Sequence, residues 1–185
     1  MKIISGFHRG RPIETLEGLS TRPPLEHTRA AIFNTLHERV KKANVLDLFA
    51  GSGSMGLEAL SRGAAACHFV EINHRALKTL KRNIKSFDYE QISSVFQEKV
   101  PGVLHSLKDH KYDLIFIDPP FDAMMMGQFL RLENDCASLL SENGLIIIRF
   151  PENAPIISTP SQMSLYKEKV YGISHMKYFT HPKED

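Results

Sequence analysis

The stretch VLDLFAGSGSMGLEAL, residues 45–60, decides the fold. Its aliphatic beginning predicts a buried strand, and its end predicts a helix. Gly51, Gly53 and Gly56 stand between the two in G-x-G-x-x-G spacing. Glycines at such a turn let the backbone approach a ligand closely, and the N-terminus of the helix favours negative charge. The same spacing also fits a tight turn that binds nothing.

Aliphatic runs and amphipathic segments alternate through the chain that follows. This alternation predicts an α/β fold, in which a mostly parallel sheet has helices on both faces. Two runs near the C-terminus, separated by Gly172, predict a closing antiparallel pair. The N-terminal residues 2–16 predict a hairpin. The expected strands cover 45–50, 67–71, 92–96, 112–117, 145–150, 164–171 and 174–179, and the expected helices cover 25–41, 55–62, 74–86, 100–107 and 127–140.

Length and composition favour one domain. The chain has 185 residues, of which 42% are hydrophobic, enough for a sizeable core. No aliphatic run approaches the ~20 residues of a membrane span, and the N-terminus lacks the apolar core of a secretion signal. Cys67 and Cys136 lie in apolar surroundings, and the histidines lack ligand spacing. We therefore expect a cytoplasmic protein without a disulfide, a metal site or a membrane partner.

Positive charge is concentrated at the N-terminal end. Residues 1–44 carry eight Lys and Arg against four Asp and Glu, a net +4, whereas the remaining residues carry 15 against 17, a net −2. A basic segment on an otherwise balanced domain is typical of phosphate-backbone binding. It is also compatible with an ordinary solvated face.

Two carboxylates beside the glycine loop indicate its ligand. Asp47 lies inside the first strand, where it could reach the ammonium group of an amino-acid-like ligand. Glu71 ends the next strand, where a carboxylate can accept hydrogen bonds from both hydroxyls of a ribose. Glu71 suits NAD and S-adenosylmethionine alike, and Asp47 favours the latter. The residues expected to bind S-adenosylmethionine are Asp47, Phe49, Gly51, Ser52, Gly53, Glu71, Ile72 and Glu98.

A second motif, Asp118-Pro119-Pro120-Phe121, follows the strand expected over 112–117. In a doubly wound sheet this turn reaches the same edge as the glycine loop. The Asp118 carboxylate and the Pro119 carbonyl could accept both hydrogens of one exocyclic amine, which would orient its lone pair toward a methyl donor. Phe121 could support a base taken out of its stack. The plain alternative is a proline-rich turn with a buried phenylalanine.

These residues resemble a known family. DPPF matches the (D/N/S)-P-P-(Y/F) signature of S-adenosylmethionine-dependent methyltransferases that modify exocyclic or amide nitrogens. The chain as a whole is similar to the bacterial 16S ribosomal RNA guanine-N2 methyltransferases of the RsmD type, nearly from end to end. The segments that carry the resemblance are IISGFHRGRPI, TRP, RAAIFNTL, LDLFAGSGSMGLEALSRGA, VEINHRAL, DLIFIDPPF, NGLIII and KEKVYGIS.

The resemblance implies a Rossmann-like class I methyltransferase with a seven-stranded sheet and a short hairpin-plus-helix extension at its N-terminus. The single domain, 1–185, would then consist of an RNA-binding extension, 1–41, and a catalytic core, 42–185. The implied reaction methylates N2 of one guanine, position 966 in the bacterial convention, in 16S rRNA of the assembled or assembling small subunit. We expect a monomer. The expected RNA-binding residues are Arg9, Arg11, Arg22, Arg29 and Asn34.

The chain departs from the family pattern at several positions. Pro24 follows the Arg-Pro pair where a threonine is usual, and His27 stands near a basic position. Lys99 occupies the place aligned with the usual adenine contact, which leaves Gln97 or Glu98 for that role. Arg149 follows the fifth strand, where an acid is common. These departures affect cofactor affinity and RNA docking rather than the DPPF chemistry.

Other functions fit part of the pattern. An adenine-N6 methyltransferase acting on DNA or RNA could use the same turn, although a DNA enzyme normally needs a target-recognition domain. A protein-glutamine methyltransferase usually has Asn at the position of Asp118. A non-catalytic ribosome-assembly or RNA-binding protein could retain the fold. An NAD-dependent oxidoreductase could use the glycine loop, but Asp47 would be out of place in it.

Overall fold

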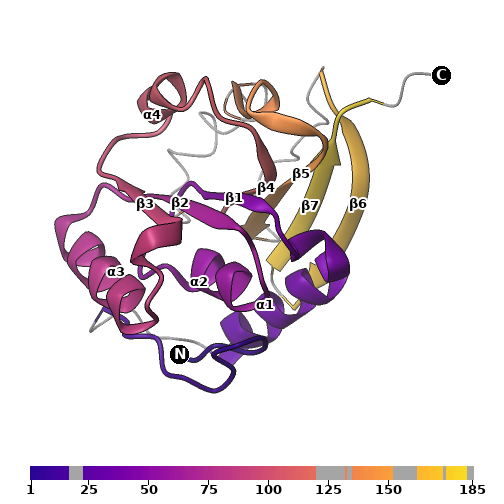
Figure 1. The fold of residues 1–185 in the computed structure, drawn as a ribbon. Coiled ribbons are helices and arrows are strands. Elements are labelled where there is room, and N and C mark those ends of the chain that lie inside the picture. The colour runs from indigo at the N-terminus through magenta and orange to yellow at the C-terminus, as the bar shows by residue number, and fades with distance from the viewer. Residues whose placement is uncertain (17–22, 120–131, 133–134, 152–161, 173, 183–185) are drawn as a thin grey trace.

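One seven-stranded sheet organises the described part of the chain (Figure 1). The computed structural model describes residues 1–16, 23–119, 132, 135–151, 162–172 and 174–182. The strand order is β3-β2-β1-β4-β5-β7-β6, with β1 to β5 parallel and β7 antiparallel to both β5 and β6. The expected mostly parallel sheet is therefore confirmed. The strands are β1 Asn44–Asp47, β2 Ala66–Val70, β3 Ser93–Phe96, β4 Tyr112–Ile117, β5 Leu140–Pro151, β6 Ser164–Tyr171 and β7 Ser174–Thr180.

Helices cover both faces of the sheet (Figure 1). On one face lie α1 Pro23–Leu36, α2 Ser54–Ser61 and α3 His74–Ser86, and on the other lies α4 Gly102–Ser106. Short 3-10 helices follow at His37–Val40 and Glu90–Ile92. The α3 helix begins where the Asn73 side chain accepts hydrogen bonds from the backbone N–H groups of Arg75 and Ala76, at 2.9 and 3.1 Å.

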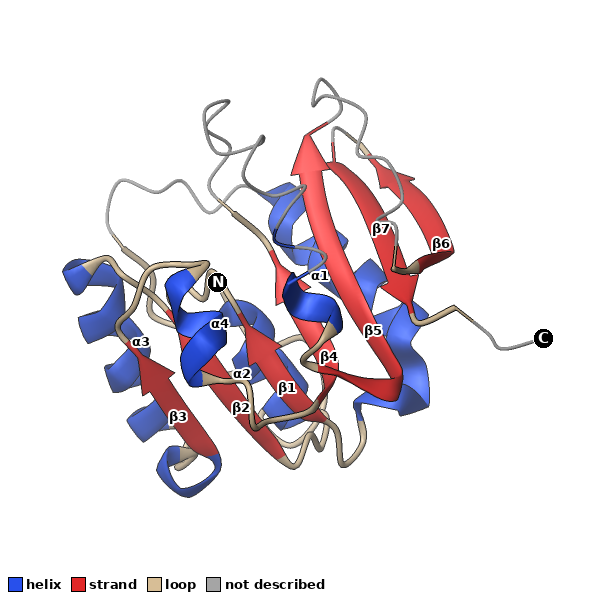
Figure 2. Cartoon of the chain, turned by 90° about the horizontal axis from the view of Figure 1, so that it is seen from above, coloured by secondary structure: helices blue, strands red, loops and turns tan. Residues whose placement is uncertain are grey.

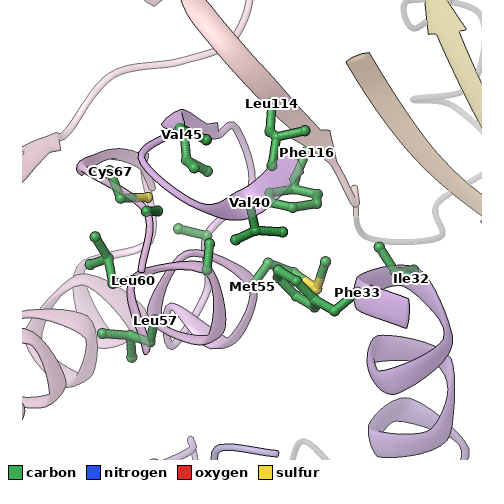
Figure 3. Close-up of a cluster of buried hydrophobic side chains, with 14 of the residues drawn as sticks. Ile32, Phe33, Val40, Val45, Met55, Leu57, Leu60, Cys67, Leu114 and Phe116 are labelled. Atoms are coloured by element: carbon green, nitrogen blue, oxygen red, sulfur yellow. The ribbon is translucent and has the colours of Figure 1, made fainter. Parts of the chain in front are cut away.

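Alternation along the central strands builds a separate core on each face. Val45, Leu114 and Phe116 pack with α1 and α2 (Figure 3). Leu46 and Ile115 point the other way and pack with α4. Because both faces are buried, the strands read as continuous aliphatic runs in the sequence. The sheet is thus held in a fixed register between two apolar layers.

The carboxyl ends of β1, β2 and β4 meet at one edge of the sheet. The chain goes from β1 to β2 and β3 on one side, and β4 then returns to pair with β1 on the other (Figure 2). Such a switch point is where open α/β sheets bind ligands. Asp47 pairs with Phe116, so Asp118 follows two residues beyond that pair. The topology therefore brings the glycine loop and the Asp118 turn together.

The N-terminal segment packs along α2. An isolated antiparallel bridge joins Lys2 to Pro12. The backbone N–H groups of Ile4 and Ser5 donate to the carboxylate of Glu58, at 2.7 and 3.1 Å. Glu58 is fully buried in the middle of α2. The Glu58 carboxylate therefore attaches the N-terminal segment to α2.

Several boundaries differ from the sequence-based expectations. The helix expected over 25–41 ends at Leu36, and a 3-10 turn follows in which His37 has φ +47°. The helix expected over 127–140 is wrong at its end, because Leu140 belongs to β5 and pairs with Tyr112. Much of that expected helix lies outside the described residues. None of the described helices is both long and apolar enough to cross a membrane.

Candidate active site

The three glycines of the loop after β1 have two different roles. Gly51 and Gly53 have φ of +55° and +89°, which side chains rarely adopt. No described neighbouring atom lies within 4 Å of the position that a Cβ would take at Gly51. At Gly53 a Cβ would lie 2.5 Å from Leu80, and at Gly56 it would lie 2.2 Å from Phe69. Gly51 therefore leaves room beside the loop, whereas Gly53 and Gly56 allow α2 to pack.

Glu71 is fixed by the loop that it faces. One carboxylate oxygen accepts from the Gly51 N–H at 2.8 Å, and the other accepts from the Asn73 N–H at 2.6 Å. Each oxygen keeps a further lone pair for another donor. Nearby, the Ser52 carbonyl accepts from the Asn83 side chain at 2.8 Å, which ties the loop to α3. The Glu71 carboxylate is thus oriented before any ligand binds.

Asp47 is a buried carboxylate with one unsatisfied oxygen. Its Oδ2 accepts from the Gly56 N–H at 3.0 Å, while Oδ1 has no hydrogen-bond partner among the described residues. Burial, together with the charges of Asp118 and Glu71, raises the pKa of Asp47 to about 7, and the Gly56 hydrogen bond opposes the shift. A buried carboxylate oxygen without a donor is costly, so Oδ1 is suited to accept from a cationic group of a ligand.

A small apolar cavity lies beside Glu71. Phe49, Ile72 and Glu98, three of the residues expected to bind the cofactor, line it. Leu48, Val70 and Val100 complete its wall. Glu98 also accepts from Ser106 at 3.3 Å. Apolar walls together with the carboxylates of Glu71 and Glu98 suit a flat heterocycle that carries donor groups.

Asp118 directly follows β4 and lies beside a second cavity of about 110 Å³. The cavity is also lined by Arg29, Ser54 and Arg149. Arg149 Nε donates to Asp118 Oδ1 at 2.7 Å. Burial raises the pKa of Asp118, and the ion pair with Arg149 opposes that shift. Pro119 is buried next to Asp118. Pro120 and Phe121, the other residues expected in this turn, lie outside the described residues.

The expected RNA-binding residues do not share one environment. Arg9, Arg11 and Asn34 are exposed, and Arg22 lies outside the described residues. Arg11 donates to the Ser86 carbonyl at 2.5 Å, so part of its side chain holds the N-terminal segment.

The structure corrects the expectation for Arg29. Its side chain is 3% exposed, lies 3.7 Å from Glu58, and donates to the Lys2 carbonyl. Arg29 therefore joins α1 to the N-terminal segment and is not a surface cation that meets a phosphate. The sequence analysis overlooked Glu58, the centre of this contact. The available signal was a single acid within the apolar stretch GLEAL.

Comparison with known proteins identifies the family. The sequence profile described as "Conserved hypothetical protein 95" matches residues 1–180. Ribosomal RNA small subunit methyltransferase D from Haemophilus influenzae is 33% identical over 177 residues, which cover 94% of this chain and 90% of that protein. The chain belongs to the RsmD family of methyltransferases. The Escherichia coli K12 protein of the same name is 30% identical over 172 residues, covering 93% of this chain and 85% of its own length.

A solved structure shares the fold nearly from end to end. A hypothetical protein from Thermus thermophilus superposes with a TM-score of 0.81 at 27% identity, covering 98% of this chain and 99% of that one. The chain is an S-adenosylmethionine-dependent methyltransferase with the class I fold of its family.

The residues of this RsmD-family site fit S-adenosylmethionine. The unsatisfied Oδ1 of Asp47 can pair with an ammonium group. The open space at Gly51 lets the backbone approach a ligand, and the oriented Glu71 can accept from ribose hydroxyls. The apolar cavity beside Glu71 can take the adenine. We propose that these residues hold the cofactor in this way.

Proposed function

We propose that the protein methylates the exocyclic N2 of one guanine in 16S rRNA of the assembled or assembling small ribosomal subunit. The observation that carries the proposal is the position of Asp118, at the end of β4 beside the glycine loop and a cavity. The names of the curated relatives support ribosomal RNA as the substrate class. Residues 1–41 form the RNA-binding extension and 42–185 the catalytic core. The enzyme acts as a cytoplasmic monomer.

In this proposal Asp118 and Pro119 act by orientation. S-adenosylmethionine supplies the sulfonium methyl group. A guanine amine is a poor nucleophile because its lone pair is delocalised into the ring. The Asp118 carboxylate and the Pro119 carbonyl accept its two hydrogens and turn the lone pair toward the methyl group. The amine becomes acidic when it is alkylated, so it loses a proton to water or to Asp118.

The test is a labelling experiment with matched substrates. Purified protein receives S-adenosylmethionine with a labelled methyl group, together with small subunits, naked 16S rRNA or duplex DNA. We expect label on N2 of one guanine in the ribosomal RNA. Label on adenine would overturn the guanine assignment. Cofactor binding without label on any substrate would favour a non-catalytic assembly factor.

The turn between the bridged residues Lys2 and Pro12 supports an RNA contact. Phe7 is 86% exposed, although the backbone around it is fixed. Its own N–H donates to the Ser61 carbonyl at 2.8 Å, and the His8 N–H donates to the Ser61 hydroxyl at 3.0 Å. Gly6 has φ +87° and packs against Ser61 so closely that a Cβ would lie 1.8 Å from its carbonyl oxygen. An exposed ring on a fixed backbone near Arg9 suits base stacking beside a phosphate.

We expect Phe7→Ala to weaken RNA binding about tenfold, because stacking of one base contributes ~1–3 kcal/mol. Arg9→Ala should lower the slope of log K against log salt by about one, the value for one lost phosphate contact. Filter binding across a salt series measures both quantities. Leu165→Ala on β6 and Lys108→Ala beyond α4 are the matched controls, since both are exposed and lie away from the turn. Unchanged affinity and slope in the N-terminal variants would show that this turn is only a solvated surface.

A further inference from the structure

Asp118 has a cationic partner that the proposed reaction does not use. Ile117 of β4 pairs with Ile148 of β5, so the next residues on the two parallel strands, Asp118 and Arg149, stand side by side at the end of the ladder. Arg149 Nε and Asp118 Oδ1 are 2.7 Å apart. The two side chains are 13% and 28% exposed respectively. The ion pair is therefore partly withdrawn from water, where charge interactions are stronger than at an open surface.

The ion pair lies in the wall of the cavity where the target base is proposed to enter. Arg29, Ser54 and Met55 contribute to the same wall. Among the described residues, three charged groups from neighbouring elements lie near Asp118: Arg149 from β5, Arg29 from α1, which lines the same cavity, and Asp47 from β1. Arg149 is the one that hydrogen-bonds to the Asp118 carboxylate. Asp47 acts in the opposite sense, because two nearby carboxylates repel each other.

We propose that Arg149 is a positioning residue, which holds Oδ1 of Asp118 so that Oδ2 remains as the acceptor for the target amine and the carboxylate stays ionised. This inference rests on the proposed function. An ionised carboxylate accepts hydrogen bonds at both oxygens, whereas a protonated one presents a donor to the amine. A charge-assisted bond from a planar guanidinium also restricts rotation of the carboxylate.

The charge balance around Asp118 explains why such a partner is needed. Burial at the end of β4 favours the neutral acid and raises the pKa of Asp118, and the Arg149 contact offsets this effect. The same contact lowers the proton affinity of the carboxylate. The ionised Asp118 can then orient the amine, and the proton released after methyl transfer goes to water or to Asp118.

The test compares Arg149→Met and Arg149→Lys with the unaltered enzyme. Turnover of saturating RNA substrate is measured from about pH 5 to about pH 9, since the profile of kcat reports groups in the bound complex. For Arg149→Met we expect the acidic limb to move to higher pH, with about a tenfold loss of kcat at neutral pH and recovery at alkaline pH. Arg149→Lys should give an intermediate limb, because it keeps the charge but not the planar fork.

The matched control is Lys111→Met, which removes an exposed cation that donates to the Ser138 carbonyl at 2.6 Å. It should leave the profile unchanged. A loss of kcat at every pH for Arg149→Met, without recovery at alkaline pH, would reduce Arg149 to a structural role. An unchanged profile, or a higher kcat at neutral pH, would overturn the inference. If Arg149→Met does not fold, the position of the acidic limb of the kcat profile in Arg149→Lys tests the inference, and an unshifted limb would overturn it. A failure of the proposed function would be recognised by a different result, namely that the unaltered enzyme places no methyl group on guanine.

Discussion

Asp118→Ala is expected to lower the rate of methyl transfer by about 10³-fold, because it removes an acceptor that orients the amine. Binding of S-adenosylmethionine should stay within about threefold, since Asp47 and Glu71 remain in place. Single-turnover labelling measures the rate, and calorimetry measures cofactor affinity. Asp118→Asn keeps one carbonyl acceptor at the same position and should lose less. Unchanged turnover in Asp118→Ala would refute catalysis by orientation.

The ion pair complicates this experiment and also supplies its control. Removing Asp118 alone takes a carboxylate away from the mostly buried Arg149, and the loss of that ion pair can itself disturb the site. The double variant Asp118→Ala with Arg149→Met removes both charges. If the missing acceptor causes the loss, the double variant stays inactive. Recovery of activity in the double variant would instead assign the loss to the broken ion pair.

Local patterns in the sequence predict the elements that depend on near neighbours. The helix expected over 74–86 matches α3, because Asn73 caps it and its apolar positions repeat with helical spacing. The strand expected over 112–117 matches β4 for a similar reason, since its aliphatic run ends at a proline turn. The error at Leu140 shows the limit. A short apolar run fits a helix or a strand equally well until its partner strand is known.

Features of the site that depend on distant partners are absent from the sequence pattern. The glycine loop and Glu71 follow from a strand, a turn and the next strand, which the sequence shows directly. The Asp118 contact with Arg149 depends on the register between β4 and β5, which lie 31 residues apart at this point. Arg29 resembles other basic residues of its segment, but Glu58 on α2 makes it an internal contact. Charge alone does not reveal such burial.

Asp47→Asn is expected to remove a pH dependence of both stability and cofactor binding. The folded-state pKa of Asp47 is about 7, well above the ordinary value of 3.8. Between these values the unfolded chain is ionised while the folded protein keeps the proton. The contribution of Asp47 to stability therefore falls as pH rises from about 4 to about 7 and stays low above that. Asp47→Asn should lose this slope in urea unfolding followed across the same pH range.

Cofactor binding should respond to pH in the opposite direction. An ammonium group pairs with the ionised form of Asp47, so the cofactor affinity of the unaltered protein should fall about tenfold per unit as pH drops below about 7. In Asp47→Asn the affinity should be weaker by about 10- to 100-fold at alkaline pH and should lack this slope. Calorimetry in buffers of different ionisation enthalpy would also detect the proton that binding releases.

The opposite pH dependences of stability and cofactor affinity distinguish a ligand-binding role of Asp47 from a structural one. Asp109→Asn, in the exposed turn after α4, changes the same charge and should alter neither slope. If Asp47 mainly supports the loop through its Gly56 hydrogen bond, Asp47→Asn lowers stability and affinity together at every pH. If Asp47 instead binds the ammonium group of the cofactor, Asp47→Asn loses cofactor affinity while its stability at alkaline pH is maintained or increased. A cofactor affinity of the unaltered protein that is flat below about pH 7 would contradict the second account, because a carboxylate of that pKa must lose its proton to hold the ammonium group.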